Sequence, residues 1–285
     1  MWSEAVAPAR PAVPGSGVVL AGITDEAAPD LAGQLAVLAE LGWSTVELRT
    51  VDGLAVADLD DRHFARVAST LADHGVRVVC VASRIGGWAR PITAPFEDDL
   101  AELAVLARRC AVLGTRYVRI MSYPNDGLAE SRWRARVLDR VVALAAVAEA
   151  AGVVLLHENC SGWAASDADR MLELVDAVPG SALRLLFDTG NPVAHGYDGY
   201  AVLRRVAPHV AHVHVKDARG AAFVDPGTGE ARVRDCVRLL RSVGYTGAWS
   251  LEPHVALQPH RSGLLADGAA EAFVRAGRAM AGLLR

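Results

Sequence analysis

Short, β-branched apolar runs alternate along the chain with longer amphipathic stretches rich in alanine and leucine. Eight runs have the length and composition of strands, at 18–24, 45–49, 76–83, 116–122, 153–158, 183–188, 210–216 and 248–252. Amphipathic stretches follow them and predict helices at about 30–41, 60–74, 97–112, 130–151, 167–178, 198–207, 231–242 and 265–284. Alternating strands and helices favour parallel β–α–β units, and eight such units predict a single closed (β/α)8 barrel of the α/β class, over residues 17–285.

The connections between these elements differ with direction. Turns from helix to strand are short and contain glycine, as in LGT at 113–115 and AGV at 151–153. Segments from strand to helix are longer and more polar, as at 84–96, 122–131 and 189–199. A (β/α)8 barrel carries its active site on the strand-to-helix loops, so we expect the chemistry at the C-terminal ends of the strands.

Four residues that can bind a metal stand at the ends of four separate apolar runs in the second half of the chain. They are Glu158, Asp188, His214 and Glu252. Side chains alternate faces along a strand, and this parity places all four toward the barrel interior. Buried charges are costly unless they are paired, and three carboxylates with one imidazole suit a divalent cation.

The first half of the chain contributes other charged residues at strand ends. The same parity test places Glu47, Arg49 and Arg119 inside the barrel, and Arg84 follows the third strand. In one interpretation Glu47 forms a buried ion pair with Arg49 or Arg119 that holds the barrel together. In the other, these side chains line the mouth and bind a polar substrate. The two interpretations are compatible.

We expect different roles for the histidines near the predicted site. His212 shares the inward face with His214 and Lys216, and it can be a hydrogen-bonded core residue deeper in the barrel. His157 faces outward and is expected to pack, or to support a metal ligand, rather than to bind the metal itself. His254 lies in a loop, where surface histidines are common. Lys216 is the only lysine among 29 basic residues, although arginine is otherwise preferred throughout.

Composition excludes some classes of function. With 52% apolar residues, 22% charged residues and a net charge of -4, the chain has the profile of a globular enzyme without a basic nucleic-acid footprint. The four cysteines show no CxxC spacing, which favours reduced thiols and a cytoplasmic protein. No apolar run is long enough to span a membrane. Residues 1–16 lack the features of a signal peptide and are expected to form a flexible tail.

Several segments resemble the sugar phosphate isomerase/epimerase superfamily, whose members are xylose isomerase-like barrels. They include HEN at 157–159, FDTGN at 187–191, HVHVKD at 212–217 and YTGAWSLEPH at 245–254. The resemblance implies a metal bound by Glu158, Asp188, His214 and Glu252. Manganese is the expected ion, with magnesium, cobalt or zinc as alternatives. It also implies a sugar or keto-sugar substrate and a possible homodimer. The residues that we expect to contact the substrate are Glu47, Arg84, Arg119, Asn191 and Lys216.

The resemblance further implies proton transfer next to a carbonyl, with Glu158 and Glu252 as proton acceptor and donor. A dication on the carbonyl and a neighbouring hydroxyl would stabilise the enediolate, which suits an isomerase or epimerase. Asn191 stands where several ketose 3-epimerases have histidine, which weighs against that particular reaction. A lyase of the same family, which dehydrates an inosose or eliminates from a 3-keto-glycoside, is the nearest alternative. An endonuclease IV-like enzyme and a non-catalytic sugar-binding barrel are less favoured.

Overall fold

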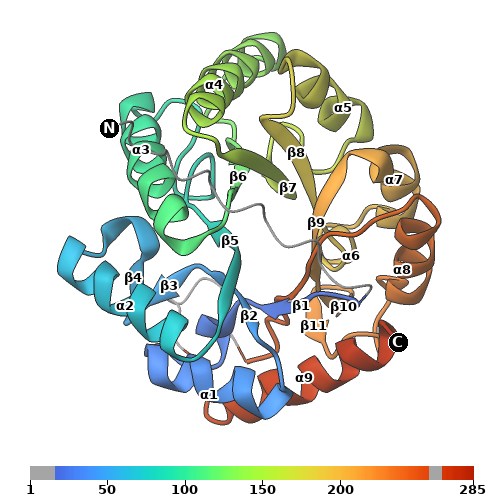
Figure 1. Cartoon of the computed structure of the whole chain (residues 1–285). Coiled ribbons are helices and arrows are strands. Elements are labelled where there is room, and N and C mark those ends of the chain that lie inside the picture. Colours follow the sequence, from blue (N-terminus) through green and yellow to red (C-terminus); the bar gives the residue numbers. More distant parts are fainter. Residues whose placement is uncertain (1–16, 257–264) are drawn as a thin grey trace, which may run out of the picture.

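The computed structural model describes residues 17–256 and 265–285. Within them, eight parallel strands form one barrel-shaped sheet (Figure 1). Its strands are β1 (Leu20–Gly22), β2 (Thr45–Leu48), β5 (Arg77–Ala82), β6 (Tyr117–Ser122), β7 (Val154–Gly162), β8 (Leu183–Asp188), β9 (Val210–Val215) and β12 (Trp249–Leu251). Each strand pairs with its neighbours in chain order, β1 pairs with β12, and a bridge between Ile23 and Glu47 links β1 to β2. The predicted (β/α)8 barrel is confirmed.

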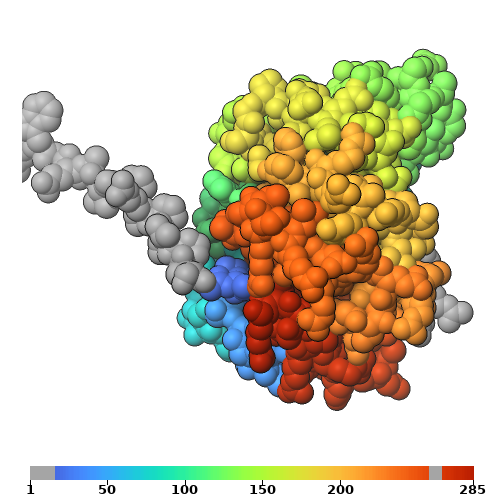
Figure 2. Space-filling model, turned by 90° about the vertical axis from the view of Figure 1, so that its right-hand side faces the viewer, coloured from blue at the N-terminus to red at the C-terminus, as the bar shows by residue number. Residues whose placement is uncertain are grey.

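Helices surround the sheet at the positions that the amphipathic pattern predicts. In the described part of the chain they are α1 (Leu31–Leu41), α2 (Asp61–Asp73), α3 (Phe96–Leu113), α4 (Glu130–Ala150), α5 (Ala168–Ala177), α7 (Gly199–Val206), α8 (Val233–Ser242) and α9 (Ala269–Leu283). Asp30 and Asp60 cap the N-termini of α1 and α2 by accepting backbone N–H bonds, and Gly114 ends α3 in the left-handed conformation. Figure 2 shows α7, α8 and α9 side by side on one flank of the barrel.

The strand-to-helix loops contain small elements that the pattern did not predict. A short helix, α6 (Asn191–Ala194), follows β8 directly. Two hairpins, β3 (Thr50–Val51) with β4 (Leu54–Ala55) and β10 (Asp217–Arg219) with β11 (Ala222–Val224), follow β2 and β9. Three single-turn 3-10 helices complete the list: η1 (Thr24–Glu26), η2 (Val56–Asp58) and η3 (Ala207–His209). Apart from η3, which leads from α7 into β9, these elements lie on the side of the barrel where the site was expected.

Apolar side chains form two separate layers. Outward-facing strand residues such as Leu185, Phe187 and Val213 pack against the helices in the main core. A much smaller cluster, Cys80, Leu156 and Leu186, is formed by inward-facing residues of β5, β7 and β8. The next inward positions on β7 and β8, two residues further along, are charged, because Glu158 and Asp188 follow Leu156 and Leu186 at the same parity. Along β7 and β8, the barrel interior therefore changes from apolar to charged toward the C-terminal ends of the strands.

The sequence predicted a flexible N-terminal tail and reduced cysteines. The flexible tail predicted at residues 1–16 lies outside the described residues. The four cysteines are free thiols, and Cys80, Cys110 and Cys236 are buried. Among the described residues, every helix is too short or too polar to be a candidate membrane span.

Gly162, at the end of β7, is needed for a close approach between neighbouring strands. It has a φ of +100°, and an added Cβ would lie 2.2 Å from the carbonyl carbon of Ser122. Gly162→Ala should therefore lower the free energy of unfolding by about 2–4 kcal/mol in denaturant titrations. Gly127→Ala is the matched control, because Gly127 also has a positive φ, +74°, but has open space around it. Equal losses in the two variants would contradict the close-approach explanation.

Candidate metal centre

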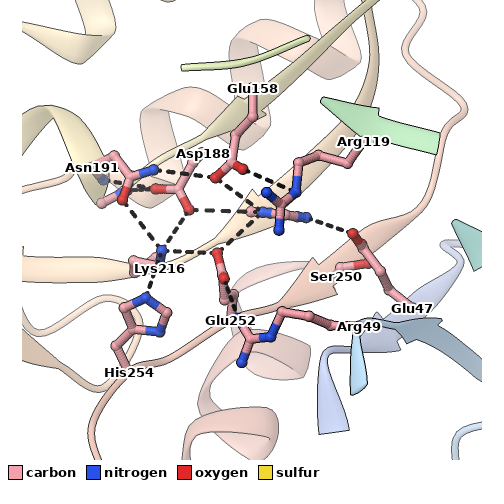
Figure 3. Close-up of polar contacts among 12 residues, drawn as sticks. Glu47, Arg49, Arg119, Glu158, Asp188, Asn191, Lys216, Ser250, Glu252 and His254 are labelled. Atoms are coloured by element: carbon pink, nitrogen blue, oxygen red, sulfur yellow. Dashed lines mark hydrogen bonds and ion pairs between the residues drawn. The ribbon is translucent and has the colours of Figure 1, made fainter. Parts of the chain in front are cut away.

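Four buried side chains meet at the C-terminal ends of the second-half strands (Figure 3). Glu158 comes from β7, Asp188 ends β8, His214 lies near the end of β9, and Glu252 directly follows β12. One ligand atom from each residue lies within 4.8 Å of the corresponding atoms of the other three. The structure therefore brings together the four residues that strand parity placed inside the barrel.

Two of the carboxylates are held at their outer oxygens by arginines. The Arg119 Nε lies 3.3 Å from Oε2 of Glu158, and the Arg49 Nη1 donates to Oε1 of Glu252 at 2.9 Å. In each case the other oxygen, Oε1 of Glu158 or Oε2 of Glu252, faces His214. Each arginine thus fixes the orientation of one carboxylate and leaves one of its oxygens toward the centre.

Asp188 is held in the same way by backbone N–H groups. Its Oδ1 accepts hydrogen bonds from the backbone N–H groups of Gly190 and Asn191, at 2.8 and 2.7 Å. These groups belong to the start of α6, so the short helix that the sequence pattern missed orients one of the predicted metal ligands. The second oxygen, Oδ2, points toward the centre, 4.0 Å from Nδ1 of His214.

His214 completes the set, because Glu47 binds its outer nitrogen. The Nε2 of His214 lies 3.0 Å from Oε1 of Glu47, so Nε2–H donates to this carboxylate and Nδ1 faces the centre, where it can hold a proton or offer its lone pair to a metal. Nδ1 lies 3.1 Å from Oε2 of Glu252 and 3.5 Å from Oε1 of Glu158. A carboxylate behind a histidine is the usual support for a metal-binding imidazole.

The donor set fits a divalent cation. Three of its inner atoms, Oδ2 of Asp188, Nδ1 of His214 and Oε2 of Glu252, are buried and make no hydrogen bond of regular geometry among the described residues, although the Lys216 ammonium approaches both oxygens as an ion-pair partner. Burial disfavours a charged imidazole, but the Glu47 and Glu252 carboxylates outweigh it and raise the pKa of His214 well above its ordinary value. Three carboxylate oxygens around one nitrogen thus favour a positive charge, which a proton or a metal ion can supply.

Lys216 adds a fixed positive charge to one side of the cluster. Its Nζ lies 2.8 Å from Oε2 of Glu252 and 3.1 Å from Oδ2 of Asp188, and it donates to Oδ1 of Asn191 at 3.2 Å. Burial disfavours the ammonium, but Asp188 and Glu252 outweigh this cost and raise the pKa of Lys216 above its ordinary value. Asn191 in turn donates from Nδ2 to Oε1 of Glu158 at 3.3 Å. Three of the residues that were predicted to contact the substrate, Lys216, Asn191 and Arg119, therefore lie next to the four candidate ligands.

The predicted ion pair of Glu47 with Arg49 or Arg119 is wrong. Oε2 of Glu47 lies 2.8 Å from Nε2 of His212, and Oε1 contacts His214. Arg49 and Arg119 turn instead to Glu252 and Glu158, whose carboxylates are closer to the barrel mouth. His212 also contacts the Ser250 hydroxyl at 2.8 Å, so it is a hydrogen-bonded core histidine, which is the role that the sequence allowed for it.

Two other predicted positions lie apart from the cluster. The Arg84 guanidinium is 47% exposed and pairs with Asp58 and Glu102. His157 is buried, and neither ring nitrogen has a hydrogen-bond partner among the described residues. Its burial lowers the pKa to about 4, so the ring stays neutral as a packing residue.

Strand parity missed three residues that complete the surroundings of the centre. Asp25 binds Arg49 through both carboxylate oxygens, at 3.0 and 2.8 Å, while Glu26 and His254 form a further cluster with Glu252. Asp25 and Glu26 lie in η1, a few residues after β1, and His254 comes two residues after Glu252. The sequence could have indicated them by their positions just beyond the ends of β1 and β12, because neighbouring parallel strands end at the same side of the sheet.

Comparison with known proteins agrees with this architecture. A family model described as "Xylose isomerase-like TIM barrel" matches residues 35–273. The chain belongs to this family. The crystal structure of the IOLI protein with a zinc atom superimposes on this xylose isomerase-like barrel with a TM-score of 0.75, at 17% identity, covering 94% of this chain and 98% of that one. At this identity, the likeness shows the fold.

Curated relatives match a shorter part of the chain. The chain is 31% identical over 142 residues to the 2-epi-5-epi-valiolone 7-phosphate 2-epimerase of Actinoplanes sp., covering 49% of this chain and 51% of the relative. It is 26% identical over 139 residues to the inosose dehydratase of Clostridium perfringens, covering 42% and 46%. The matches thus span about half the length of these relatives.

The contact between Glu47 and His214 predicts an effect on metal affinity. Glu47→Gln should weaken Mn²⁺ binding by about 10–100-fold in calorimetric titrations, because a neutral amide holds the imidazole less firmly and makes it a poorer donor. Glu102→Gln is the control, since Glu102 is also a buried carboxylate that pairs with arginines, outside the cluster. Unchanged Mn²⁺ affinity in Glu47→Gln would argue against His214 as a ligand.

Lys216 should also compete with a metal for the negative charge of the cluster. Lys216→Met is expected to lower the unfolding free energy of the metal-free protein by about 3 kcal/mol, because it leaves buried carboxylates unpaired. It should also enlarge the rise in Tm that Mn²⁺ produces. Thermal denaturation with a chelator and with Mn²⁺ measures both effects.

Arg90→Met is the matched control for Lys216→Met. Arg90 also bridges two buried carboxylates, Asp99 and Glu102, but outside the cluster. It should therefore cost stability without changing the response to Mn²⁺. Equal Mn²⁺ responses in the Lys216 variant and the wild type would show that Lys216 does not share its charge partners with a metal.

Proposed function

We propose that this protein is a divalent-metal-dependent enzyme that acts on a sugar, a keto-sugar or a related polyol by removing a proton next to a carbonyl. Glu158, Asp188, His214 and Glu252 would hold the ion, with Mn²⁺ as the first choice and Mg²⁺, Co²⁺ or Zn²⁺ as alternatives. One observation carries the proposal: each of the four side chains is bound at its outer atom and directs its inner atom to a common point.

The two glutamates are the candidates for proton transfer. A bound dication would polarise the oxygens of the substrate and make the neighbouring C–H group more acidic. Glu158 and Glu252 come from different strands, β7 and β12, so they can approach a substrate from different directions. Burial tends to raise the pKa of both, but the Arg119 guanidinium for Glu158 and the Lys216 ammonium for Glu252 lower it, so both are ionised and able to accept a proton.

The residues next to the glutamates would bind the substrate. Lys216 can donate a hydrogen bond to a substrate oxygen and balance negative charge that develops there. Asn191 and Arg119 already contact Glu158 and lie within the same buried cluster. Glu47 would act through His214, behind the metal. Arg84 is left out of the proposed contacts, because Asp58 and Glu102 bind its guanidinium.

The relatives support two outcomes of the same proton abstraction. An epimerase returns the proton to the substrate, as the likeness to the Actinoplanes epimerase favours. A lyase loses a substituent from the next carbon, as the likeness to the Clostridium inosose dehydratase favours. Both begin with the same carboxylate and the same metal ligands. We propose isomerisation or epimerisation first, with elimination as the second candidate.

Deuterium exchange tests the shared step. The Mn²⁺-loaded protein should incorporate deuterium from heavy water into at least one member of a panel of ketoses, keto-cyclitols and 3-keto-glycosides. Glu158→Gln should reduce this exchange by about 10²–10⁴-fold, because an amide cannot accept the proton. Mass spectrometry then separates the outcomes, since elimination shows a loss of water or release of an aglycone.

The same assay needs two controls. The Mn²⁺ content of Glu158→Gln must be measured, so that loss of the metal is separated from loss of the base. Glu102→Gln, with its buried carboxylate outside the cluster, should exchange at the wild-type rate. Full exchange by Glu158→Gln would rule out Glu158 as the base, and no exchange with any panel member would refute the proposed chemistry.

A further inference from the structure

His254 adopts a backbone conformation that needs support from the surrounding structure. Its φ is +54°, in the left-handed region that residues other than glycine seldom adopt. Glu26 provides the support from the opposite side of the barrel seam, where η1 follows β1. Oε2 of Glu26 accepts the backbone N–H of His254 at 2.8 Å, and Oε1 lies 2.6 Å from its Nδ1. One buried carboxylate therefore fixes both the backbone and the ring of His254.

The contact with Glu26 also decides which ring nitrogen of His254 is free to accept a hydrogen bond. Because Glu26 accepts from Nδ1–H, the lone pair is on Nε2. Nε2 points to the ammonium of Lys216, 3.4 Å away (Figure 3). This distance is long for a hydrogen bond between nitrogens, so Nε2 has capacity for a better partner.

Exposure increases from the metal centre toward His254. The side chain of Lys216 is 2% exposed and that of Glu252 is 6% exposed, whereas that of His254 is 17% exposed. Phe223, on the β10–β11 hairpin, packs edge-on against the His254 ring at 4.9 Å, and the Lys216 ammonium lies 5.5 Å from the centre of the same Phe223 ring. His254 is therefore held on one side by Glu26 and on another by Phe223, and solvent reaches it more than it reaches Lys216 or Glu252.

We propose that His254 is a substrate-specificity residue, whose Nε2 accepts a hydrogen bond from a substrate hydroxyl while Lys216 donates one to a neighbouring oxygen. Glu26 is the positioning residue that holds the ring for this purpose. An acceptor beside a donor selects a keto-polyol that carries a free hydroxyl next to a second oxygen, and it discriminates against deoxy and O-methyl analogues. This assignment rests on the proposed function, because it requires a polyol at the metal centre.

A purely structural role is the competing explanation. In it, the pair of Glu26 and His254 only joins the segment after β12 to η1 and stabilises the barrel seam. Such a role would change stability and would lower activity toward all substrates together. Recognition of a hydroxyl changes KM for substrates that carry it and leaves other substrates unaffected.

His254→Asn separates the two roles. Asparagine tolerates a positive φ better than most residues, so the backbone can keep its conformation, while its shorter side chain does not place an acceptor at the position of Nε2. With the panel compound that the wild type deuterates fastest, KM should rise about tenfold and kcat should change less than about threefold. Mn²⁺ affinity, measured by calorimetry, should stay at the wild-type value.

His63→Asn is the matched control. His63 has the same 17% side-chain exposure and also pairs with a carboxylate, that of Asp52, at 2.8 Å. It lies on α2, outside the metal centre. This control should leave KM unchanged.

Monodeoxy analogues of the same panel compound identify the hydroxyl. One of them should bind the wild type and His254→Asn with equal KM, because it lacks the group that Nε2 accepts. Glu26→Gln should raise KM for the parent compound in the same direction, since one amide oxygen cannot accept both N–H groups of His254. The double variant should be no worse than His254→Asn alone if Glu26 acts through His254.

The outcomes distinguish this inference from the proposed function. Deuterium exchange by the wild type, with KM unchanged in His254→Asn, would overturn the role of His254 and leave the proposed function standing. Equal loss of kcat on the parent and on every deoxy analogue, together with a lower Tm, would also overturn it in favour of the structural role. Absence of exchange by the wild type with all panel compounds would overturn both.

Discussion

The main constraint on the site is that three buried carboxylates, which repel one another, are held around one imidazole nitrogen. This arrangement is possible only because every member is held from behind. The groups that bind the outer atoms lie on barrel strands or directly after them: they are Arg119, Arg49, Glu47 and the N-terminus of α6. A positive charge at the centre then removes the remaining cost, which is why the donor set fits a divalent cation.

The same repulsion explains why lysine is placed where arginine is otherwise preferred. Lys216 bridges Asp188 and Glu252 through a single point charge on a flexible stem. A guanidinium is larger and planar, and it reaches two carboxylates through two separate nitrogens, as Arg90 does with Asp99 and Glu102, rather than through one atom. Gly190 illustrates how closely this region is packed, because an added Cβ would lie 2.8 Å from Cβ of Lys216.

Much of the site could be predicted, because strand parity is a local property. Eight apolar runs specified the strands, and counting alternate residues along them placed Glu158, Asp188 and His214 inside the barrel. The same counting could not assign partners. It paired Glu47 with an arginine, whereas the depth of each side chain along the barrel axis pairs it with His212 and His214. It also left His254 among ordinary loop residues, although the structure places it beside Lys216.

The sequence by itself determined the order of strands and helices, the end of the barrel that carries polar residues, and the identity of the inward-facing groups, because each depends on periodicity or on neighbouring residues. Tertiary structure alone decided which groups touch. Arg49 meets Glu252, which is 203 residues away, and Glu26 meets His254, which is 228 residues away. Such contacts exist only in the closed barrel, because closure places β1 between β12 and β2.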